Sequence, residues 1–413
     1  MTILRGEIVC VRLYGMEIIK TLTLRLLLTP EQASRAKQHA DAKRACYNWA
    51  LAMSMDEYKE TGKRPLQNEI SRRLTVLKNT EDAPWWTKVA RCTLTLAIAD
   101  LNDAYKRFFR VQKEGVKFTD KVKQRAARQK RKLTLYDMKG HPKFKKRAND
   151  RLSFYASSSQ CLNIRKNTVR ILRVGRVQFR TSQKIPEGAK LSNPRVVYVN
   201  GKWLLRLGVT FQQQQIELND YTMGIDVGTD NLAVISFNNQ EITYKHVNKE
   251  KRVRNQERRI KHLQRELSRR EEGSKRYEKT RLKLAEKHFH LSQIRRDHIH
   301  KVTRTIVNQK PKKIVLETLN ISGMMKNRYL VRIVQNAMLY AMQRQIRYKS
   351  GWQGTEIEEA PRFYPSSKLC SECGAYKKNL KLSNRVYKCD NCGSVKDRDA
   401  NAARNLSQYK GKS

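Results

Sequence analysis

The chain has 413 residues, of which 87 are Lys or Arg and 38 are Asp or Glu, so its formal net charge is +49 at pH 7. A hydrophobic content of 39% predicts folded domains, and no apolar run is long enough to span a membrane. So large a positive charge indicates a polyanionic partner, most simply nucleic acid, although a ribosomal-type structural protein or a binder of anionic membranes is also compatible with it. Because like charges repel, we expect bound RNA or DNA to be part of the stable particle.

Residues 1–29 predict an amino-terminal strand that joins a later β-barrel, because EIIKTLTLRLLL is rich in β-branched residues and Leu. The preceding MTILRGEIVCVRLYG is too short and too charged for a signal peptide, and the sequence leaves open whether translation starts at Met1 or Met16. Four of the eight cysteines are scattered and four form two pairs. This usage indicates a cytoplasmic protein with one metal site rather than a disulfide framework.

Residues 30–125 predict a helical domain. Pro30 stands in the first turn of a long helix, where proline is well tolerated. A second helix is predicted over residues 84–112, because apolar residues recur there at spacings of three and four. The residues on this apolar face are Leu94, Ile98, Leu101, Tyr105 and Phe108.

Residues 126–218 predict a basic connector followed by a small β-barrel. A basic run of this kind is either a solvated linker or a surface that contacts phosphates. Four of its residues are candidates for nucleic-acid contacts: Lys143, Lys145, Lys146 and Arg147. From residue 152 onward apolar and basic residues alternate with the period of a strand, and Asn200-Gly201 is a strong signal for a hairpin turn.

Residues 219–413 predict an α/β domain. MGIDVG, LAVISF, EITYKHV and KKIVLE have the composition of strands. Residues 248–309 are basic and helical, with a heptad-like apolar seam that is interrupted at Gly273. We therefore expect a helical hairpin inserted into this domain, which is either a solvated coiled coil or a surface that lies along a duplex.

Three acidic residues that are far apart in the sequence are candidates for one metal site. Asp226 lies in the strand MGIDVG, Glu317 ends the strand KIVLE, and Asp399 opens the helix DANAARNL. Taken singly, each could be a turn or cap residue. Adjacent parallel strands and a crossing helix would bring them together, and we then expect two Mg²⁺ ions, roughly 4 Å apart, that promote phosphodiester hydrolysis. Asp397 is expected to orient the backbone or Arg398 instead.

A second metal site is predicted from the cysteine pairs. Cys370, Cys373, Cys389 and Cys392 form the pattern C-x2-C-x15-C-x2-C, and a glycine follows each pair. Four thiolates at this spacing are typical of one structural Zn²⁺ ion. We therefore expect a zinc ribbon over residues 366–396. It either acts as a lid beside the acidic residues or only fastens a long loop.

The chain resembles the transposon-encoded TnpB family and its close relatives, the miniature type V CRISPR effector nucleases. The resemblance rests on GIDVGTDNLAVIS, IVLETLNISGM, FYPSSKLCSECG, YKCDNCGSVKDRDANAARNL, ACYNWAL and LNDAYKRFF. It implies a multidomain α+β protein with a helical recognition lobe, a β-barrel wedge domain and an RNase H-like RuvC domain that carries the hairpin and the zinc ribbon. It also implies that Asp226, Glu317 and Asp399 are the catalytic Mg²⁺ ligands.

The function that the resemblance implies is RNA-guided DNA cleavage. Such a protein binds a structured guide RNA as a monomer or homodimer, recognises a short motif in double-stranded DNA and cuts both strands with one site. Tyr47 and Trp49 are candidates for reading that motif, and we expect no membrane partner and a place at the nucleoid of a prokaryotic cell. Two alternatives stay open: an RNA-guided DNA-binding regulator that does not cleave, and an RNA-independent transposase or resolvase.

Overall fold

The computed structural model describes the chain from residue 16 to residue 411. Short segments inside that span are not described: residues 81–83, 114, 116–117, 148–151, 157–161, 214–215 and 382–383. The choice between Met1 and Met16, and the part of the predicted strand that precedes Met16, therefore lie outside the described residues. Among the helices that are described, none is both long and apolar enough to cross a membrane.

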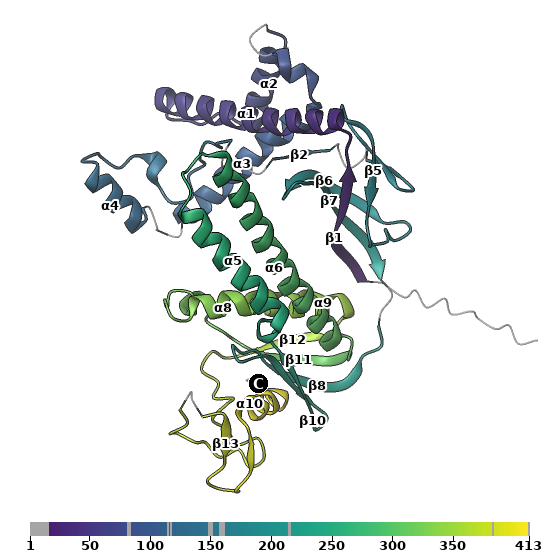
Figure 1. Ribbon diagram of the computed structural model, residues 1–413, viewed down its shortest axis with the longest axis vertical. Helices are drawn as coiled ribbons and strands as arrows, with labels where there is room; N and C mark the ends of the chain where they lie inside the picture. Colours follow the sequence, from purple (N-terminus) through teal and green to yellow (C-terminus); the bar gives the residue numbers. More distant parts are fainter. Residues whose placement is uncertain are drawn as a thin grey trace, which may run out of the picture. The chain divides into compact units, whose positions relative to one another are not determined.

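The chain divides into two compact units, residues 17–212 and residues 213–413 (Figure 1). The helical elements of the first unit are α1 (Pro30–Thr61), α2 (Gln67–Lys78), η1 (Pro84–Lys88), α3 (Arg91–Lys113), α4 (Asp120–Arg128) and η2 (Leu135–Asp137). The start of α1 is confirmed at Pro30. Thr29 caps this helix by accepting a hydrogen bond from the main-chain N of Gln32 at 3.2 Å.

The predicted helix 84–112 is confirmed except at its start. Residues 84–88 form a 3₁₀ turn, and the α-helix begins at Arg91. The main-chain N–H of Ala90 donates to Nε2 of His39 at 3.1 Å, so it is not part of the helical ladder. All five residues of the predicted apolar face are buried, and they pack against Cys46, Ala50 and Leu51 of α1.

A seven-stranded sheet forms the rest of the first unit, in the order β2-β6-β7-β1-β5-β4-β3. Its strands are β1 (Met16–Leu27), β2 (Ser153–Tyr155), β3 (Asn163–Arg165), β4 (Thr168–Ile171), β5 (Gly175–Arg180), β6 (Lys190–Val199) and β7 (Lys202–Gln213). The amino-terminal strand joins this sheet, as predicted. The hairpin turn is also confirmed, since φ is 47° at Asn200 and 77° at Gly201.

The predicted barrel is confirmed in part: the strands form one curled, half-barrel sheet, but the sheet does not close among the described residues. β2 and β3 are its two edges, and no pairing between them is seen in the described part of the chain. Each is three residues long, so neither offers a ladder long enough to close a barrel. One face of the sheet buries Leu24, Val177 and Leu205.

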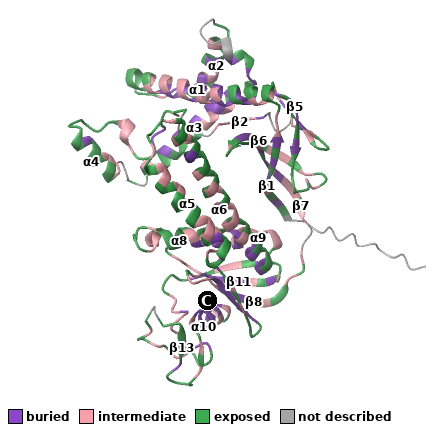
Figure 2. Cartoon of the chain, in the orientation of Figure 1, coloured by how far each residue is buried: buried purple, intermediate pink, exposed green. Residues whose placement is uncertain are grey.

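The second unit is built on a mixed five-stranded sheet in the order β10-β9-β8-β11-β12. Its strands are β8 (Asn219–Asp226), β9 (Asn231–Phe237), β10 (Gln240–Lys245), β11 (Pro311–Glu317) and β12 (Glu356–Ala360). β11 runs parallel to both β8 and β12, whereas β9 is antiparallel to β8. The apolar residues just before the carboxyl ends of β8 and β11 are buried (Figure 2), and so is most of β9, which explains their continuous apolar runs.

Helices cover both faces of this sheet. The predicted hairpin is present, and Gly273, with φ at 87°, lies in its turn. Ile306 of α6 and Met342 of α9 pack on one face with Ile225, and α10 packs on the other face against Val234 and Val315. The helical elements are η4 (Val247–Lys249), α5 (Lys251–Ser268), α6 (Lys275–Val307), α7 (Ile321–Met324), α8 (Val331–Ala337), α9 (Leu339–Gln353) and α10 (Arg398–Ser407).

Gly224 of β8 allows α10 to lie directly on the sheet. A Cβ atom at this position would be 2.0 Å from the main-chain O of Ala403 and 2.3 Å from the main-chain N of Ser407. Both are backbone atoms of the helix, so they could not rotate away as a side chain would. The absence of a side chain at Gly224 therefore allows the carboxyl-terminal half of α10 to lie close to β8.

We expect Gly224→Ala to push α10 off the sheet and to lower the free energy of unfolding. Forcing an extra methyl group into a packed contact typically costs about 1–3 kcal/mol. Gly351→Ala on α9 is the matched control, because a Cβ there meets no atom within 4 Å and Ala favours a helix over Gly by about 1 kcal/mol. Thermal unfolding should give a lower midpoint for the first variant and an equal or higher one for the second. Equal midpoints for both would contradict this account of the contact.

Candidate active site

The parallel pairing of β8 and β11 brings Asp226 and Glu317 side by side. Ile225 is the register partner of Leu316, so the next residue of each strand stands at the same sheet edge. The main-chain O of Glu317 accepts a hydrogen bond from the buried side-chain amide of Gln343 at 3.0 Å. The register of two apolar strands thus determines where both carboxylates lie, as the sequence predicts.

Asp399 approaches the same edge from the first turn of α10. Asp397 is the cap of this helix, since its Oδ1 accepts hydrogen bonds from the main-chain N of Asp399 at 2.9 Å and of Ala400 at 3.0 Å. This confirms the expectation that Asp397 orients the backbone. Asp399 itself is only 8% exposed, and its Oδ2 accepts a hydrogen bond from the side-chain amide of Asn231 in β9 at 3.5 Å.

The electrostatics show that the three carboxylates share one site. Burial raises the pKa of Asp226 well above its usual range, and the negative charges of Glu317 and Asp399 raise it further. Burial also raises the pKa of Glu317, although a hydrogen bond from Asp226 acts in the opposite direction. The site therefore concentrates negative charge that the surrounding protein compensates only in part.

Two arginines lie beside Asp399. Nη2 of Arg398 is 3.6 Å from one carboxylate oxygen of Asp399, and Nη1 of Arg385 is 4.0 Å from the other. The three carboxylates do not form so tight a group as the cysteines described next. Among the residues that the structure describes, the cysteines alone bring a full set of ligand atoms within 4.8 Å of one another.

The four cysteines gather as the sequence predicts. Sγ of Cys370 is 3.6 Å from Sγ of Cys392, and Sγ of Cys373 is 3.6 Å from Sγ of Cys389. Tetrahedral zinc with Zn–S bonds of about 2.3 Å requires S···S distances of about 3.8 Å, so the cluster fits this ion. The strands β13 (Val386–Lys388) and β14 (Val395–Asp397) form the ribbon beside it.

Two buried asparagines join the segment of the first cysteine pair to α10. Asn401 accepts from the main-chain N of Ser371 at 3.0 Å and donates to the main-chain O of Leu369 at 2.6 Å. Asn405 donates to the same carbonyl at 2.8 Å and to that of Ser366 at 2.7 Å. The helix that carries Asp399 is therefore bonded to the loop that carries the first cysteine pair. Their spacing of four within the alanine-rich DANAARNL could have identified them from the sequence.

The candidate nucleic-acid contacts fall into two groups. Tyr47 is a core residue, 4% exposed, and Nζ of Lys145 lies 3.8 Å from the centre of its ring. Trp49 is half-buried and packs edge-on against Trp86, with the ring centres 5.8 Å apart. The expectation that Tyr47 reads DNA therefore has no support from its placement, because the ring has almost no free surface. The exposed candidates are Lys143, Lys146 and Arg147.

Family models match three parts of the chain. The IS605 OrfB helix-turn-helix domain matches residues 16–63, the IS605 OrfB domain described as a probable transposase matches 207–328, and the Cas12f1-like TNB domain matches 340–406. Over 395 residues the chain is 27% identical to a Streptomyces pristinaespiralis protein provisionally named RNA-guided DNA endonuclease, which covers 94% of this chain and 89% of that protein. The chain is a TnpB-like protein. InsQ of Escherichia coli K12, with the same provisional name, is 26% identical over 394 residues.

The site residues of this TnpB-like protein lie in two of the matched segments. Asp226 and Glu317 belong to the transposase segment, whereas Asp399 and the cysteines belong to the TNB segment. The segment matched as a helix-turn-helix consists here of one strand, β1, and one helix, α1. Its description therefore does not apply to this fold.

Cas12f1 proteins are similar to the TnpB-like protein in both sequence and structure. Cas12f1 of Sulfoacidibacillus thermotolerans, a CRISPR-associated endodeoxyribonuclease, is 28% identical over 218 residues, which is half of each chain. A solved Cas12f1 in complex with single-guide RNA and target DNA is 16% identical and superposes with a TM-score of 0.50, covering 95% of this chain and 99% of that one. At this identity the superposition establishes a shared fold.

Proposed function

We propose that this TnpB-like protein is an RNA-guided DNA endonuclease. It binds a structured guide RNA, recognises a short motif in duplex DNA and hydrolyses both strands at one RuvC-type site. The observation that carries the proposal is the meeting of Asp226, Glu317 and Asp399 at one sheet edge in a chain whose net charge is +49. The names of the full-length relatives and the complex in which Cas12f1 was solved support RNA guidance.

The three carboxylates are suitable ligands for Mg²⁺ ions. They are hard oxygen donors and are buried or half-buried. The negative charges of Glu317 and Asp399 help to raise the pKa of Asp226, and a divalent cation would relieve this repulsion. When bound, Mg²⁺ lowers the pKa of a coordinated water and stabilises charge on the leaving oxygen of a phosphodiester. A basic protein that places its few buried acids together concentrates cation binding at one point of its surface.

Residues around the carboxylates orient them. Asp397 fixes the first turn of α10 and with it the main chain of Asp399, while Gln343 holds the main chain of Glu317. Arg398 and Arg385 offset part of the negative charge, and they are placed to attract a phosphate to the site. The exposed Lys and Arg side chains elsewhere bind the backbone of RNA and DNA in a salt-dependent manner.

The test is guided cleavage by the full chain with the RNA that copurifies with it. That RNA is sequenced, its guide segment is replaced, and a plasmid that carries the matching target is offered with Mg²⁺. We expect cuts in both strands at the matched target and none in a plasmid with a scrambled target. Target binding without cleavage would favour a guided regulator. Cleavage without RNA would favour a transposase or resolvase, the activity that the description of the matched IS605 domain names.

A further inference from the structure

The turn that joins β8 to β9 lies between two residues of the candidate site. Residues 227–230 form this turn, directly after Asp226 at the end of β8. Asn231 opens β9 on the far side of the turn, and its side-chain amide donates to Oδ2 of Asp399 at 3.5 Å. The position of one short turn therefore affects Asp226 directly and Asp399 through Asn231.

His246 makes a buried contact with this turn. It directly follows β10, it is 6% exposed, and its Nε2 lies 3.0 Å from the main-chain O of Gly228. The ladder between β8 and β9 ends at the pair Asp226 and Val234, so the main chain of the turn depends on contacts of this kind. Because a carbonyl oxygen can only accept a hydrogen bond, Nε2 of His246 carries a proton and donates it.

The end of β10 is irregular just before His246. The register of β10 against β9 shifts between Tyr244 and Lys245, and bulges of this kind change the direction of the side chains beside them. Burial lowers the pKa of His246, although its bond to Gly228 acts in the opposite direction, so the ring is neutral at pH 7. His246 thus presents one N–H group to the turn from a fixed, uncharged ring.

The chain on both sides of His246 is held by α6. Nε2 of His298 donates to the main-chain O of Lys245 at 3.0 Å. Nε of Arg295, a side chain that is 13% exposed, donates to Oδ1 of Asn248 at 2.8 Å. Because the main chain is fixed before and after His246, its ring can determine where the turn lies.

A second contact with the turn is exposed. Nζ of Lys249 is 2.7 Å from the carboxylate of Asp230, and the two side chains are 53% and 44% exposed. Ion pairs of this kind contribute little, because water and salt screen them. The buried hydrogen bond from His246 is therefore the stronger constraint on the turn.

We propose that His246 is a positioning residue of the carboxylate site. By donating to Gly228 it fixes the turn that follows Asp226, and with it the direction of the Asp226 carboxylate and the reach of the Asn231 amide to Asp399. His246 acts through the main chain of the turn and not by contact with a substrate. The proposal rests on the proposed function, because it assigns His246 to the same cation site.

Three substitutions of His246 in the full chain separate its hydrogen bond from the volume of its ring. His246→Phe keeps a ring without a donor. His246→Gln carries an amide N–H with about the reach of Nε2, whereas His246→Asn carries the same amide too close to the main chain to reach Gly228. The comparison of Gln with Asn decides the question even if the Phe variant does not fold, because these two side chains are equally polar.

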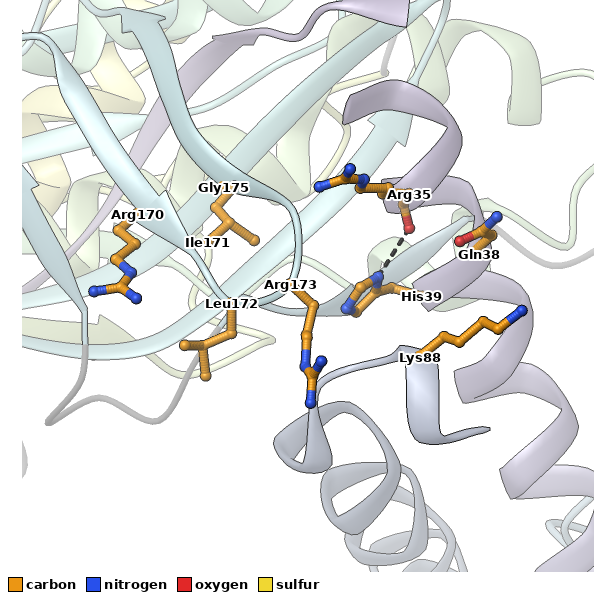
Figure 3. Close-up of a pocket in the computed structure, with 9 residues that line it drawn as sticks. All are labelled: Arg35, Gln38, His39, Lys88, Arg170, Ile171, Leu172, Arg173 and Gly175. Atoms are coloured by element: carbon orange, nitrogen blue, oxygen red, sulfur yellow. Dashed lines mark hydrogen bonds between the residues drawn. The ribbon is translucent and has the colours of Figure 1, made fainter. Parts of the chain in front are cut away.

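His39→Phe is the matched control. His39 belongs to the other compact unit, it is 1% exposed, and it lines a pocket there. Its Nδ1 is 2.8 Å from the main-chain O of Arg35, a contact that Figure 3 shows. The control therefore removes a buried histidine that also bonds the main chain, but at a place that is not part of the carboxylate site.

Two measurements test the proposal without any cleavage. Mn²⁺ binding is followed by electron paramagnetic resonance, and amide hydrogen exchange of residues 222–233 is measured in the metal-free protein. We expect His246→Phe and His246→Asn to bind Mn²⁺ about tenfold more weakly than the wild type, the lower end of the roughly 10–100-fold that partners outside the ligand shell contribute. Their turn should also exchange faster. His246→Gln should stay close to the wild type in both measurements, and His39→Phe should change neither.

Equal Mn²⁺ affinity and equal exchange in the wild type and in all three His246 variants would overturn the proposal and leave the proposed function intact. A His246→Gln variant as impaired as His246→Asn would overturn it as well, because the donor would then not be the group that matters. A wild type that bound no Mn²⁺ would contradict the proposed cation site itself, and the positioning role would be lost with it.

Discussion

Asp226→Asn should abolish DNA cleavage while guide RNA and target DNA still bind. The substitution keeps the shape of the side chain but removes its negative charge, which in the wild type interacts with the charges of Glu317 and Asp399. Loss of one preorganised charge-bearing group typically lowers a rate by about 10²–10³-fold. For the loss of a cation ligand we expect a decrease at or beyond the upper end of this range. Single-turnover cleavage and a gel-shift assay on the same preparation measure the two properties separately.

Asp230→Asn is the matched control for this substitution. Asp230 lies four residues further along the chain, its side chain is 44% exposed, and its carboxylate pairs with Nζ of Lys249 at 2.7 Å. The change in charge is the same, but the removed group belongs to a surface ion pair. We expect cleavage to continue at close to the wild-type rate. If both variants lost cleavage equally, net charge rather than the carboxylate site would explain the effect.

The Asp226→Asn substitution should also stabilise the metal-free protein at neutral pH. The pKa of Asp226 is higher in the folded than in the unfolded state, so ionisation of this group opposes folding as the pH rises through its folded value. Asn cannot ionise, and the stabilisation of Asp226→Asn over the wild type should therefore grow with pH and vanish in acid below the ordinary pKa of Asp. Thermal unfolding in a chelating buffer at several pH values measures this. A difference that did not change with pH would contradict the raised pKa.

Removing one of the predicted zinc ligands should strongly destabilise the fold. Cys389→Ser deletes one of four thiolates, and structural zinc sites of this kind provide about 10–16 kcal/mol of folding free energy in isolated zinc-finger peptides. We expect zinc content to fall from one ion per chain to well below that, and the midpoint of thermal unfolding to decrease. Cleavage should decrease as well, because Asn401 and Asn405 bond the ribbon to the helix of Asp399.

Cys92→Ala is the control for the zinc prediction. Cys92 belongs to α3 in the first unit and is not part of the sulfur cluster. Zinc content measured by atomic spectroscopy should be unchanged in this variant. Wild-type zinc content in Cys389→Ser would show that the cluster is not the zinc site.

The parts of the fold that depend on local sequence were predictable. Apolar strands that end in a carboxylate indicate both the strands and the sheet edge where Asp226 and Glu317 meet. Thr29-Pro30 and Asn200-Gly201 determine a helix start and a hairpin through their own backbone preferences. In each case the residues that form the feature are close together in the chain, so their pattern carries the information.

The features that the sequence did not reveal depend on contacts between distant segments. The sequence suggests that Tyr47 contacts nucleic acid, but the packing of α1 against α3 buries its ring. The edges of the first sheet stay unpaired because β2 and β3 are short, and the lengths of these strands are known only once their pairing partners are known. The sequence does not indicate why residue 224 is glycine; the reason is the close approach of α10 to this position. This contact joins segments that are far apart in the chain, so no local motif encodes it.

Cation binding by the carboxylate site is tested most directly with Mn²⁺, which is paramagnetic and prefers the same oxygen ligands as Mg²⁺. The full chain is titrated with Mn²⁺ and the free ion is followed by electron paramagnetic resonance, for the wild type, Asp226→Asn and Asp230→Asn. We expect the wild type and Asp230→Asn to bind Mn²⁺ equally, and Asp226→Asn to have lost this binding. Identical binding curves for all three proteins, or DNA cleavage that persists in excess chelator, would contradict this expectation.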